Sequence, residues 1–179
     1  MVHDSPPLNH SHPLKEGCSA PDGRVLFICR GNLCRSPMAM ALLRHKLAAG
    51  DSGIRMEVDS AGYHDWGTFL REAHPFARRA VQELCGTDLL AEHVARRWNP
   101  DMVLPPTLVV VAEEWMRADF PVERVMTLRE LAGESGDVAD PYGSDYPTYV
   151  ECARAIERLL DAGMAALVGR PARDRRRRM

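Results

Sequence analysis

The segment at residues 29–36, which reads Cys-Arg-Gly-Asn-Leu-Cys-Arg-Ser, carries residue types suited to holding a phosphate group. Cys29 and Arg35 stand six positions apart, between a short apolar run and a helical pattern. The planar guanidinium of Arg35 matches two phosphate oxygens. Gly31 lets the backbone curl, so that successive N–H groups can face an anion, and the positive end of the following helix points at the same spot. The segment therefore predicts a phosphate-binding loop.

In such an electropositive loop, Cys29 is expected to be a thiolate at neutral pH and therefore a nucleophile. Ser36 can steady that thiolate by a hydrogen bond, cap the helix that follows, or do both. No G-x-x-x-x-G-K-S/T motif is present, which argues against a nucleoside triphosphatase. The loop residues predicted to bind phosphate or substrate are Arg30, Gly31, Asn32, Leu33, Cys34 and Ser36.

Alternating strands and helices are expected to position this loop. The apolar run at 25–28 is typical of a strand buried on both faces. Ser36 and Pro37 predict the start of a helix that ends near Gly50. The other predicted elements are strands at 56–60, 108–111 and 124–127, helices at 75–84, 113–119 and 149–167, and a loop at 134–147.

This alternation predicts an α/β fold, a three-layer sandwich with a central, mostly parallel sheet of about four strands flanked by helices. The phosphate-binding loop follows the first strand, at the edge where such sheets bind ligands. One domain is expected over residues 23–169. Residues 1–22 are expected to be a flexible extension, and residues 170–179 a disordered, arginine-rich tail.

Composition limits the function classes. The chain has 179 residues, 45% of them hydrophobic, and a formal net charge of −2. The last ten residues hold six arginines and one aspartate, so the rest of the chain is acidic, which argues against a nucleic-acid partner. No apolar run of about 18 residues predicts a membrane span, and the first residues do not read as a secretory signal.

The five cysteines are odd in number and irregularly spaced, with no Cys-x-x-Cys pair or zinc-type cluster. A disulfide framework is therefore not expected. Reduced thiols and a cytoplasmic location are expected instead.

Three segments together resemble the low-molecular-weight protein tyrosine phosphatase family. They are VLFICRGNLCRSPMA after residue 24, DSAG at 59–62 and GDVADPYG at 136–143. Within the loop, Cys29, Gly31, Asn32, Arg35 and Ser36 fit the pattern of the family, whereas positions 30 and 33 vary in it.

The resemblance implies a chemistry. Cys29 would form a phosphocysteine, Arg35 would stabilise the transferred phosphoryl group, and Asp140 of the Asp-Pro-Tyr motif would be the general acid and then the base. Taken alone, Asp140 before proline is more typical of a turn residue, and the phosphate-binding loop upstream favours the catalytic role. The implied reaction releases inorganic phosphate and needs no metal or other cofactor. Tyr142, and one of Tyr63, Trp66 and Phe69, would wall the substrate cleft, although the aromatic residues of 61–70 could also pack only locally.

Cys34 allows two interpretations. A reversible Cys29–Cys34 disulfide, as the resemblance implies, would guard the nucleophile against over-oxidation. Alternatively, Cys34 is simply a small buried residue. Cys85 and Cys152 lie on apolar helical stripes and are expected in the core.

The identity of the substrate rests on Leu33. The later segments resemble a bacterial branch that includes protein-arginine phosphatases, whose arginine-specific members carry Thr at this position. A branched apolar side chain at this position narrows the substrate-binding slot and suits a flat aromatic ring. Phosphotyrosine is therefore expected first, phosphoarginine second and a small phosphorylated metabolite third. The phosphorylated partner would thus be a protein or a small phosphate ester.

Two functions from other classes rank lower. An arsenate reductase of the same fold would need two further cysteines close together, and only Cys85 lies in the middle of the chain. A non-catalytic phosphate-binding module would be favoured by loss of Cys29, Arg35 or Asp140, and all three are present.

The chain also departs from the pattern of the family at Met40, at the end of the third strand (residues 111–114) and after residue 62.

Overall fold

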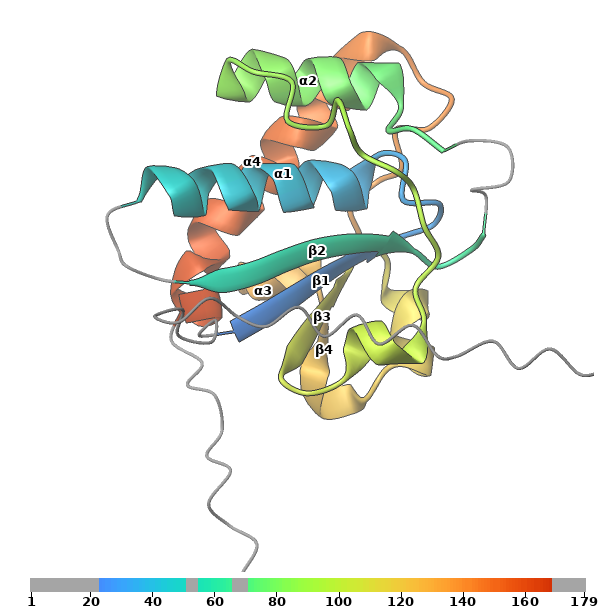
Figure 1. Cartoon of the computed structure of the whole chain (residues 1–179), viewed down its shortest axis with the longest axis vertical. Helices are drawn as coiled ribbons and strands as arrows, with labels where there is room; N and C mark the ends of the chain where they lie inside the picture. The colour runs from blue at the N-terminus through green and yellow to red at the C-terminus, as the bar shows by residue number, and fades with distance from the viewer. Residues whose placement is uncertain (1–22, 51–54, 66–70, 169–179) are drawn as a thin grey trace, which may run out of the picture.

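The computed structural model describes residues 23–50, 55–65 and 71–168. The predicted extension and the arginine-rich tail lie outside these ranges, as do Trp66 and Phe69. The described strands are β1 (Gly23–Cys29), β2 (Met56–Gly62), β3 (Thr107–Val111) and β4 (Val125–Thr127). They form one sheet in the order β2-β1-β3-β4, and every pairing is parallel (Figure 1). The prediction of a parallel, four-stranded sheet is therefore confirmed.

The apolar run of β1 serves two cores. Val25 and Phe27 point into the larger hydrophobic cluster, whereas Leu26 and Ile28 point into a smaller cluster on the other face. All four side chains are at most 2% exposed. Because successive side chains of a strand point to opposite faces, only a continuous apolar run can fill both cores.

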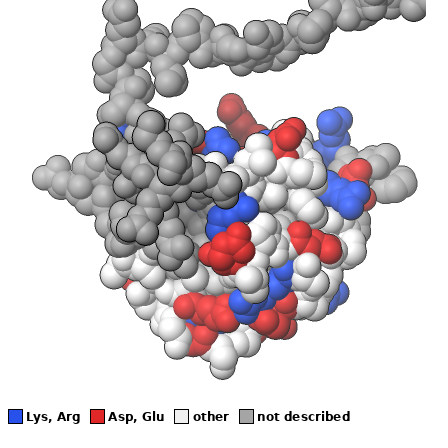
Figure 2. Space-filling view, turned by 90° about the horizontal axis from the view of Figure 1, so that it is seen from below, with Lys and Arg blue, Asp and Glu red and all other residues white. Residues whose placement is uncertain are grey.

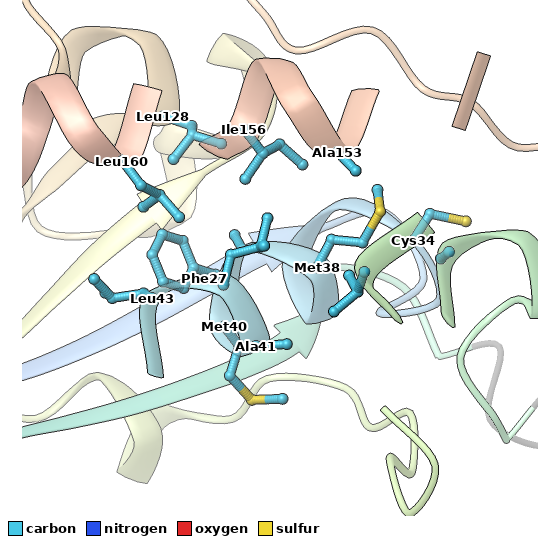
Figure 3. Close-up of a cluster of buried hydrophobic side chains, with 14 of the residues drawn as sticks. Phe27, Cys34, Met38, Met40, Ala41, Leu43, Leu128, Ala153, Ile156 and Leu160 are labelled. Atoms are coloured by element: carbon cyan, nitrogen blue, oxygen red, sulfur yellow. The ribbon is translucent and has the colours of Figure 1, made fainter. Parts of the chain in front are cut away.

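Helices cover the two faces unequally. The helices α1 (Arg35–Ala49), α2 (Pro75–Cys85), α3 (Leu128–Leu131) and α4 (Tyr146–Val168) pack around the larger cluster (Figures 1 and 3). The other face is covered by the short 3₁₀ helices η1 (Pro100–Val103) and η2 (Glu114–Asp119), and η3 (Val122–Arg124) precedes β4. The sheet is thus flanked by helices, as predicted, with one thick and one thin layer.

Two predicted helix starts are wrong. Helix α1 begins at Arg35, so Ser36 lies inside the helix and its hydroxyl does not cap it; the N-cap position is Cys34. Helix α4 begins at Tyr146, three residues before the predicted start, because the carboxylate of Asp145 accepts a hydrogen bond from the backbone N–H of Thr148 (3.2 Å). Asp145 thus acts as the helix cap that the apolar pattern alone did not indicate.

Other boundaries differ by a few residues. Strand β2 extends two residues beyond its prediction, to Gly62, and the predicted helix at 113–119 is the 3₁₀ helix η2. Three short elements, η1, η3 and α3, were not predicted. Each is at most four residues long, too short to show a helical period in the sequence.

Charged side chains of both signs lie next to one another on the face that Figure 2 shows. Several exposed ion pairs are present, such as Arg24 with Glu57 and Arg79 with Glu83. Exposed pairs of this kind contribute at most about 1 kcal/mol each. The buried clusters therefore dominate stability. Within the described residues, no helix is long and apolar enough to cross a membrane.

Candidate active site

The strand order creates a crevice between the carboxyl ends of β1 and β3. The chain leaves β1 toward β2 on one side and later adds β3 and β4 on the other, so the connections diverge at this point. Ligands of open parallel sheets bind at such a switch point. The loop of residues 30–34 follows β1 here, and Glu113 stands just after β3. The two ends are joined by a hydrogen bond from the N–H of Ala112 to the carbonyl of Ile28 (2.8 Å).

The back of the loop belongs to the hydrophobic core. Leu33 and Cys34 are 4% and 3% exposed and join the larger cluster, in which Cys34 lies near Met38 (Figure 3). The carbonyl of Leu33 accepts a hydrogen bond from the N–H of His74 (2.9 Å), just before α2. Core packing therefore fixes the loop from behind.

Asn32 holds the loop from within. Its φ of 57° is in the left-handed region, which asparagine tolerates better than most residues. Its side-chain nitrogen donates to the hydroxyls of Ser36 and Ser60, both at 2.9 Å, and its side-chain oxygen accepts from the backbone N–H of Arg96 (3.2 Å). A ring nitrogen of His93 lies 2.9 Å from its carbonyl oxygen.

Cys29 ends β1 at the bottom of the loop. Its Sγ lies 3.0 Å from Oγ of Ser36, and both side chains are buried. The Ser36 hydroxyl also lies 3.2 Å from the carbonyl of Ala61. Because Asn32 donates to the same oxygen, the single hydroxyl proton of Ser36 is free to go to either the carbonyl or the sulfur. A thiolate at Cys29 would receive it.

Gly62, at the end of β2, lies against the loop backbone. A Cβ there would come within 2.9 Å of the carbonyl carbon of Gly31 and 3.1 Å of the N of Asn32. Both neighbours are backbone atoms, so neither can rotate away.

We expect Gly62→Ala to displace the loop, to lower the free energy of unfolding by about 1–3 kcal/mol and to weaken phosphate binding. Urea unfolding and inhibition by inorganic phosphate measure the two effects. Gly23→Ala is the matched control, since its nearest contact would be the Met56 methyl at 3.9 Å. Equal behaviour of the two variants would contradict this prediction.

Arg35 is the central cation of the site and is 1% exposed. Its Nη1 donates to the carbonyl of Val138 and pairs with Oε1 of Glu113, both at 2.8 Å. Its Nη2 lies 2.7 Å from Oδ2 of Asp140. Among the described residues, the buried Nε and Nη2 have no well-aligned hydrogen-bond acceptor. The Nε side of the guanidinium is therefore available to an oxyanion, whereas Nη2 already forms an ion pair with Asp140.

Asp140 and Tyr142 stand at the mouth. The Asp140 side chain is 28% exposed, and its Oδ1 accepts from the N–H of Tyr142 (3.3 Å), which gives the turn expected before proline. Tyr142 is 45% exposed and contacts His74 edge to face.

Most predicted site residues converge on one pocket. Its lining is Cys29, Arg30, Gly31, Leu33, Cys34, Arg35, Asp140 and Tyr142. The other two predicted residues do not line the pocket: Asn32 holds the loop from within, and Ser36, in the first turn of α1, contacts Cys29 and Asn32. A thiol, a buried cation with a free edge and a partly exposed carboxylate thus share one cavity, which is the set that phosphoryl transfer to sulfur requires.

Comparisons with known proteins show which family this chain resembles. Residues 24–172 match the sequence model of the low molecular weight phosphotyrosine protein phosphatases. The chain is 32% identical to a protein-arginine-phosphatase from Geobacillus stearothermophilus over 146 residues, which is 77% of this chain and 91% of that protein. It is 31% identical to a low molecular weight protein-tyrosine-phosphatase from Streptomyces coelicolor over 156 residues, 80% of this chain and 93% of the relative.

The chain belongs to the low molecular weight phosphotyrosine protein phosphatase family. A crystal structure of such a phosphatase from T. tengcongensis superposes with a TM-score of 0.72 at 28% identity, over 80% of this chain and 98% of that one. An arginine phosphatase from Geobacillus stearothermophilus superposes with a TM-score of 0.67 at 30% identity, over 80% and 92%. The predicted fold and family are confirmed, and this chain is a cysteine-dependent phosphatase.

Sequence reasoning missed Glu113 as a residue of this phosphatase site. Burial would raise the pKa of Glu113, but hydrogen bonds from Arg30 and Trp115, together with the charge of Arg35, lower that pKa to about 2. The side chain is therefore a carboxylate at neutral pH. The sequence after β3 could have indicated this site, since two glutamates and a tryptophan follow closely on the apolar run at 108–111.

Trp115 was also missed. Its indole N–H donates to Oε2 of Glu113 (2.7 Å), and its ring contacts Tyr63 edge to face and stacks on His64. The hydroxyl of Tyr63 also bonds to Asp119. Among the aromatic residues predicted to wall the cleft after β2, Tyr63 thus packs against η2 and does not line the pocket.

The other cysteines are placed as follows. Cys34 is a free thiol whose pKa is raised to about 12, chiefly by burial, and its Sγ lies 3.7 Å from the Tyr149 hydroxyl. Cys29 is also a free thiol, so a reversible disulfide between them stays a prediction. Cys152 is buried, whereas Cys85 is only partly buried at the edge of the core.

Proposed function

We propose that this enzyme hydrolyses protein phosphotyrosine, through a phosphocysteine on Cys29 and without a metal. The observation that carries the choice of substrate is Leu33. Its buried, branched side chain lines the pocket together with Cys29 and the exposed ring of Tyr142. The apolar surfaces that Leu33 and Tyr142 give the pocket favour a flat aromatic ring over a polar guanidinium, whose hydrogen-bond donors would lose water without finding partners.

The first step is transfer of the phosphoryl group to sulfur. The Cys29 sulfur attacks phosphorus, so the S–P bond forms while the bond from phosphorus to the tyrosyl oxygen breaks. A proton from Asp140 goes to that leaving oxygen. Arg35 is buried with a free edge and, with the loop N–H groups, stabilises the charge on the equatorial oxygens.

The second step is hydrolysis of the phosphocysteine. Asp140, now ionised, takes a proton from a water molecule, and the resulting oxygen attacks phosphorus. The S–P bond breaks and the thiolate returns, so inorganic phosphate is the product. The Ser36 hydroxyl, 3.0 Å from the sulfur, stabilises this thiolate in both steps.

Protein phosphoarginine is the second candidate substrate. It is favoured by the relative from Geobacillus stearothermophilus, which is named a protein-arginine-phosphatase. The same catalytic groups would then cleave a bond from phosphorus to nitrogen, and Asp140 would protonate the leaving guanidine. Leu33 is the residue that argues against this substrate.

The deciding experiment compares phosphate release from a phosphotyrosine peptide and a phosphoarginine peptide under identical conditions, as kcat/KM. We expect phosphotyrosine to be preferred by wild type. A preference for phosphoarginine would overturn the choice of substrate, and cleavage of only a small aryl phosphate would point to a metabolite.

A variant tests the role of Leu33 directly. We expect Leu33→Thr to shift the ratio of the two kcat/KM values toward phosphoarginine by about tenfold, because it widens the slot and adds a hydroxyl. Leu33→Val is the matched control, since it shortens the side chain without adding a hydroxyl. If both variants change the ratio equally, slot width alone and not polarity sets the preference.

A cytoplasmic location belongs to the same proposal. The reaction needs a reduced Cys29, and the cysteines within the described residues are free thiols. The expected partners are phosphorylated proteins, with inorganic phosphate as product and without a nucleic acid.

A further inference from the structure

Arg30 was predicted to contact phosphate, but its guanidinium makes a two-pronged contact with Glu113. Its Nε donates to Oε1 (2.9 Å) and its Nη2 to Oε2 (2.8 Å). The Arg30 side chain is 47% exposed, whereas that of Glu113 is 9% exposed. Arg30 therefore covers the carboxylate from the solvent side.

Glu113 lies between two guanidinium groups. Its Oε1 is 2.8 Å from Nη1 of Arg35 on the buried side, and Trp115 completes the set of donors. The four donor nitrogens fix the carboxylate, and through it they fix the plane of the Arg35 guanidinium. The edge of Arg35 that bears Nε stays unpaired within the described residues.

The charge balance of Arg30, Glu113 and Arg35 affects anion binding. One carboxylate beside Arg35, in a partly buried site, cancels most of the positive charge that an incoming phosphate would meet. A second guanidinium on the same carboxylate restores a net charge of +1 to the group. Asp140, which also pairs with Arg35, makes this compensation more important.

We propose that Arg30 is a positioning residue that neutralises Glu113 and thereby keeps the charge of Arg35 available for the phosphate group of the substrate. This inference rests on the proposed function, since it assigns a role in the same site. Arg30 acts through Glu113 and does not need to touch the reacting atoms.

The test measures phosphate affinity without turnover. Iodoacetamide alkylates Cys29, and inorganic phosphate protects it; the phosphate concentration that halves the alkylation rate, followed by peptide mass spectrometry, gives Kd. We expect Arg30→Leu to raise this Kd by about tenfold, whereas Glu113→Gln leaves it equal or lower. The double variant Arg30→Leu/Glu113→Gln should return to within about twofold of wild type, since the carboxylate to be neutralised is gone.

Two further variants separate charge from architecture. Arg30→Lys keeps the charge without the two-pronged geometry, so it should keep the wild-type Kd within about twofold. Arg24→Leu is the matched control, because Arg24 pairs with Glu57 at the other end of β1. Urea midpoints identify any variant that fails to fold.

The outcomes are distinct. An unchanged Kd in Arg30→Leu, or a failure of Glu113→Gln to restore it, would overturn the inference. Equal losses in Arg30→Lys and Arg30→Leu would overturn it as well, because a purely structural contact would explain them. The assay reports binding, so a wild-type protein that binds phosphate but hydrolyses no phosphorylated substrate would refute the proposed function alone.

Discussion

Cys29→Ser is expected to abolish phosphate release while leaving the phosphate-binding loop folded. A serine hydroxyl is a far weaker nucleophile than a thiolate, and loss of a catalytic nucleophile lowers kcat by about four orders of magnitude or more. The remaining contacts of the loop do not involve the sulfur, since Asn32 and Arg35 bond to other groups. The variant should therefore still bind phosphorylated peptide, and it should trap the substrate.

Phosphate release and peptide binding are measured on the same sample, the latter by calorimetry. Cys85→Ser is the matched control, because that thiol lies at the end of α2, outside the pocket, and should keep wild-type activity. Residual turnover in Cys29→Ser at more than about one hundredth of wild type would assign the nucleophile to another group.

Asp140→Asn is expected to slow the first step according to the leaving group. An asparagine cannot supply a proton, and general acid catalysis is worth about 10²- to 10⁴-fold. The loss should be large for phosphotyrosine and unsubstituted phenyl phosphate. It should be small for p-nitrophenyl phosphate, whose leaving oxygen is stable as an anion. The measurement is kcat/KM across a series of aryl phosphates.

The dependence on the leaving group separates acid catalysis from a change in Arg35. Asp140 pairs with Arg35, so the variant also removes a negative charge from the site. That loss should tighten the binding of inorganic phosphate and act equally on all substrates. Asp137→Asn is the matched control from the same segment, since its Oδ1 only accepts the N–H of Glu114 (2.7 Å) and an amide oxygen can do the same. A uniform loss across the series would refute the assignment of Asp140 as the acid.

Much of the fold could be predicted because its signals are local. The apolar runs of β1 and β3 each supply residues to both cores, and such continuous apolar runs are typical of buried parallel strands. The predicted helix starts were wrong because tertiary contacts can engage a side chain that would otherwise cap the helix. Ser36 and Pro37 look like a cap and a first turn, yet the Ser36 hydroxyl is engaged by Cys29 and Asn32 instead, and the helix begins earlier.

The phosphate-binding loop could be predicted because its residues are contiguous in the sequence. Asp140 could be predicted as the general acid only through the resemblance to the family. Glu113 and Trp115 could not, since they lie more than 80 positions beyond Arg30 and reach the site only because β3 pairs with β1. Their role depends on side-chain direction at the end of a strand, which a single sequence does not specify. Tyr63 is the opposite case. The sequence predicts it as one of three aromatic residues that could wall the substrate cleft, but its ring packs against Trp115 of η2.

The anchoring of Asn32 has a consequence for entropy. Its backbone and side chain are tied to Ser36, Ser60, His93 and Arg96 before any anion arrives. Fixing one residue of a mobile loop costs about 1–2 kcal/mol at room temperature, and here that cost belongs to folding rather than to binding. A loop already in its binding shape lets the full interaction with phosphate appear as affinity, both for the substrate and for the more highly charged transition state. The left-handed backbone of Asn32 is thus part of a loop that is preorganised for phosphate in the folded protein.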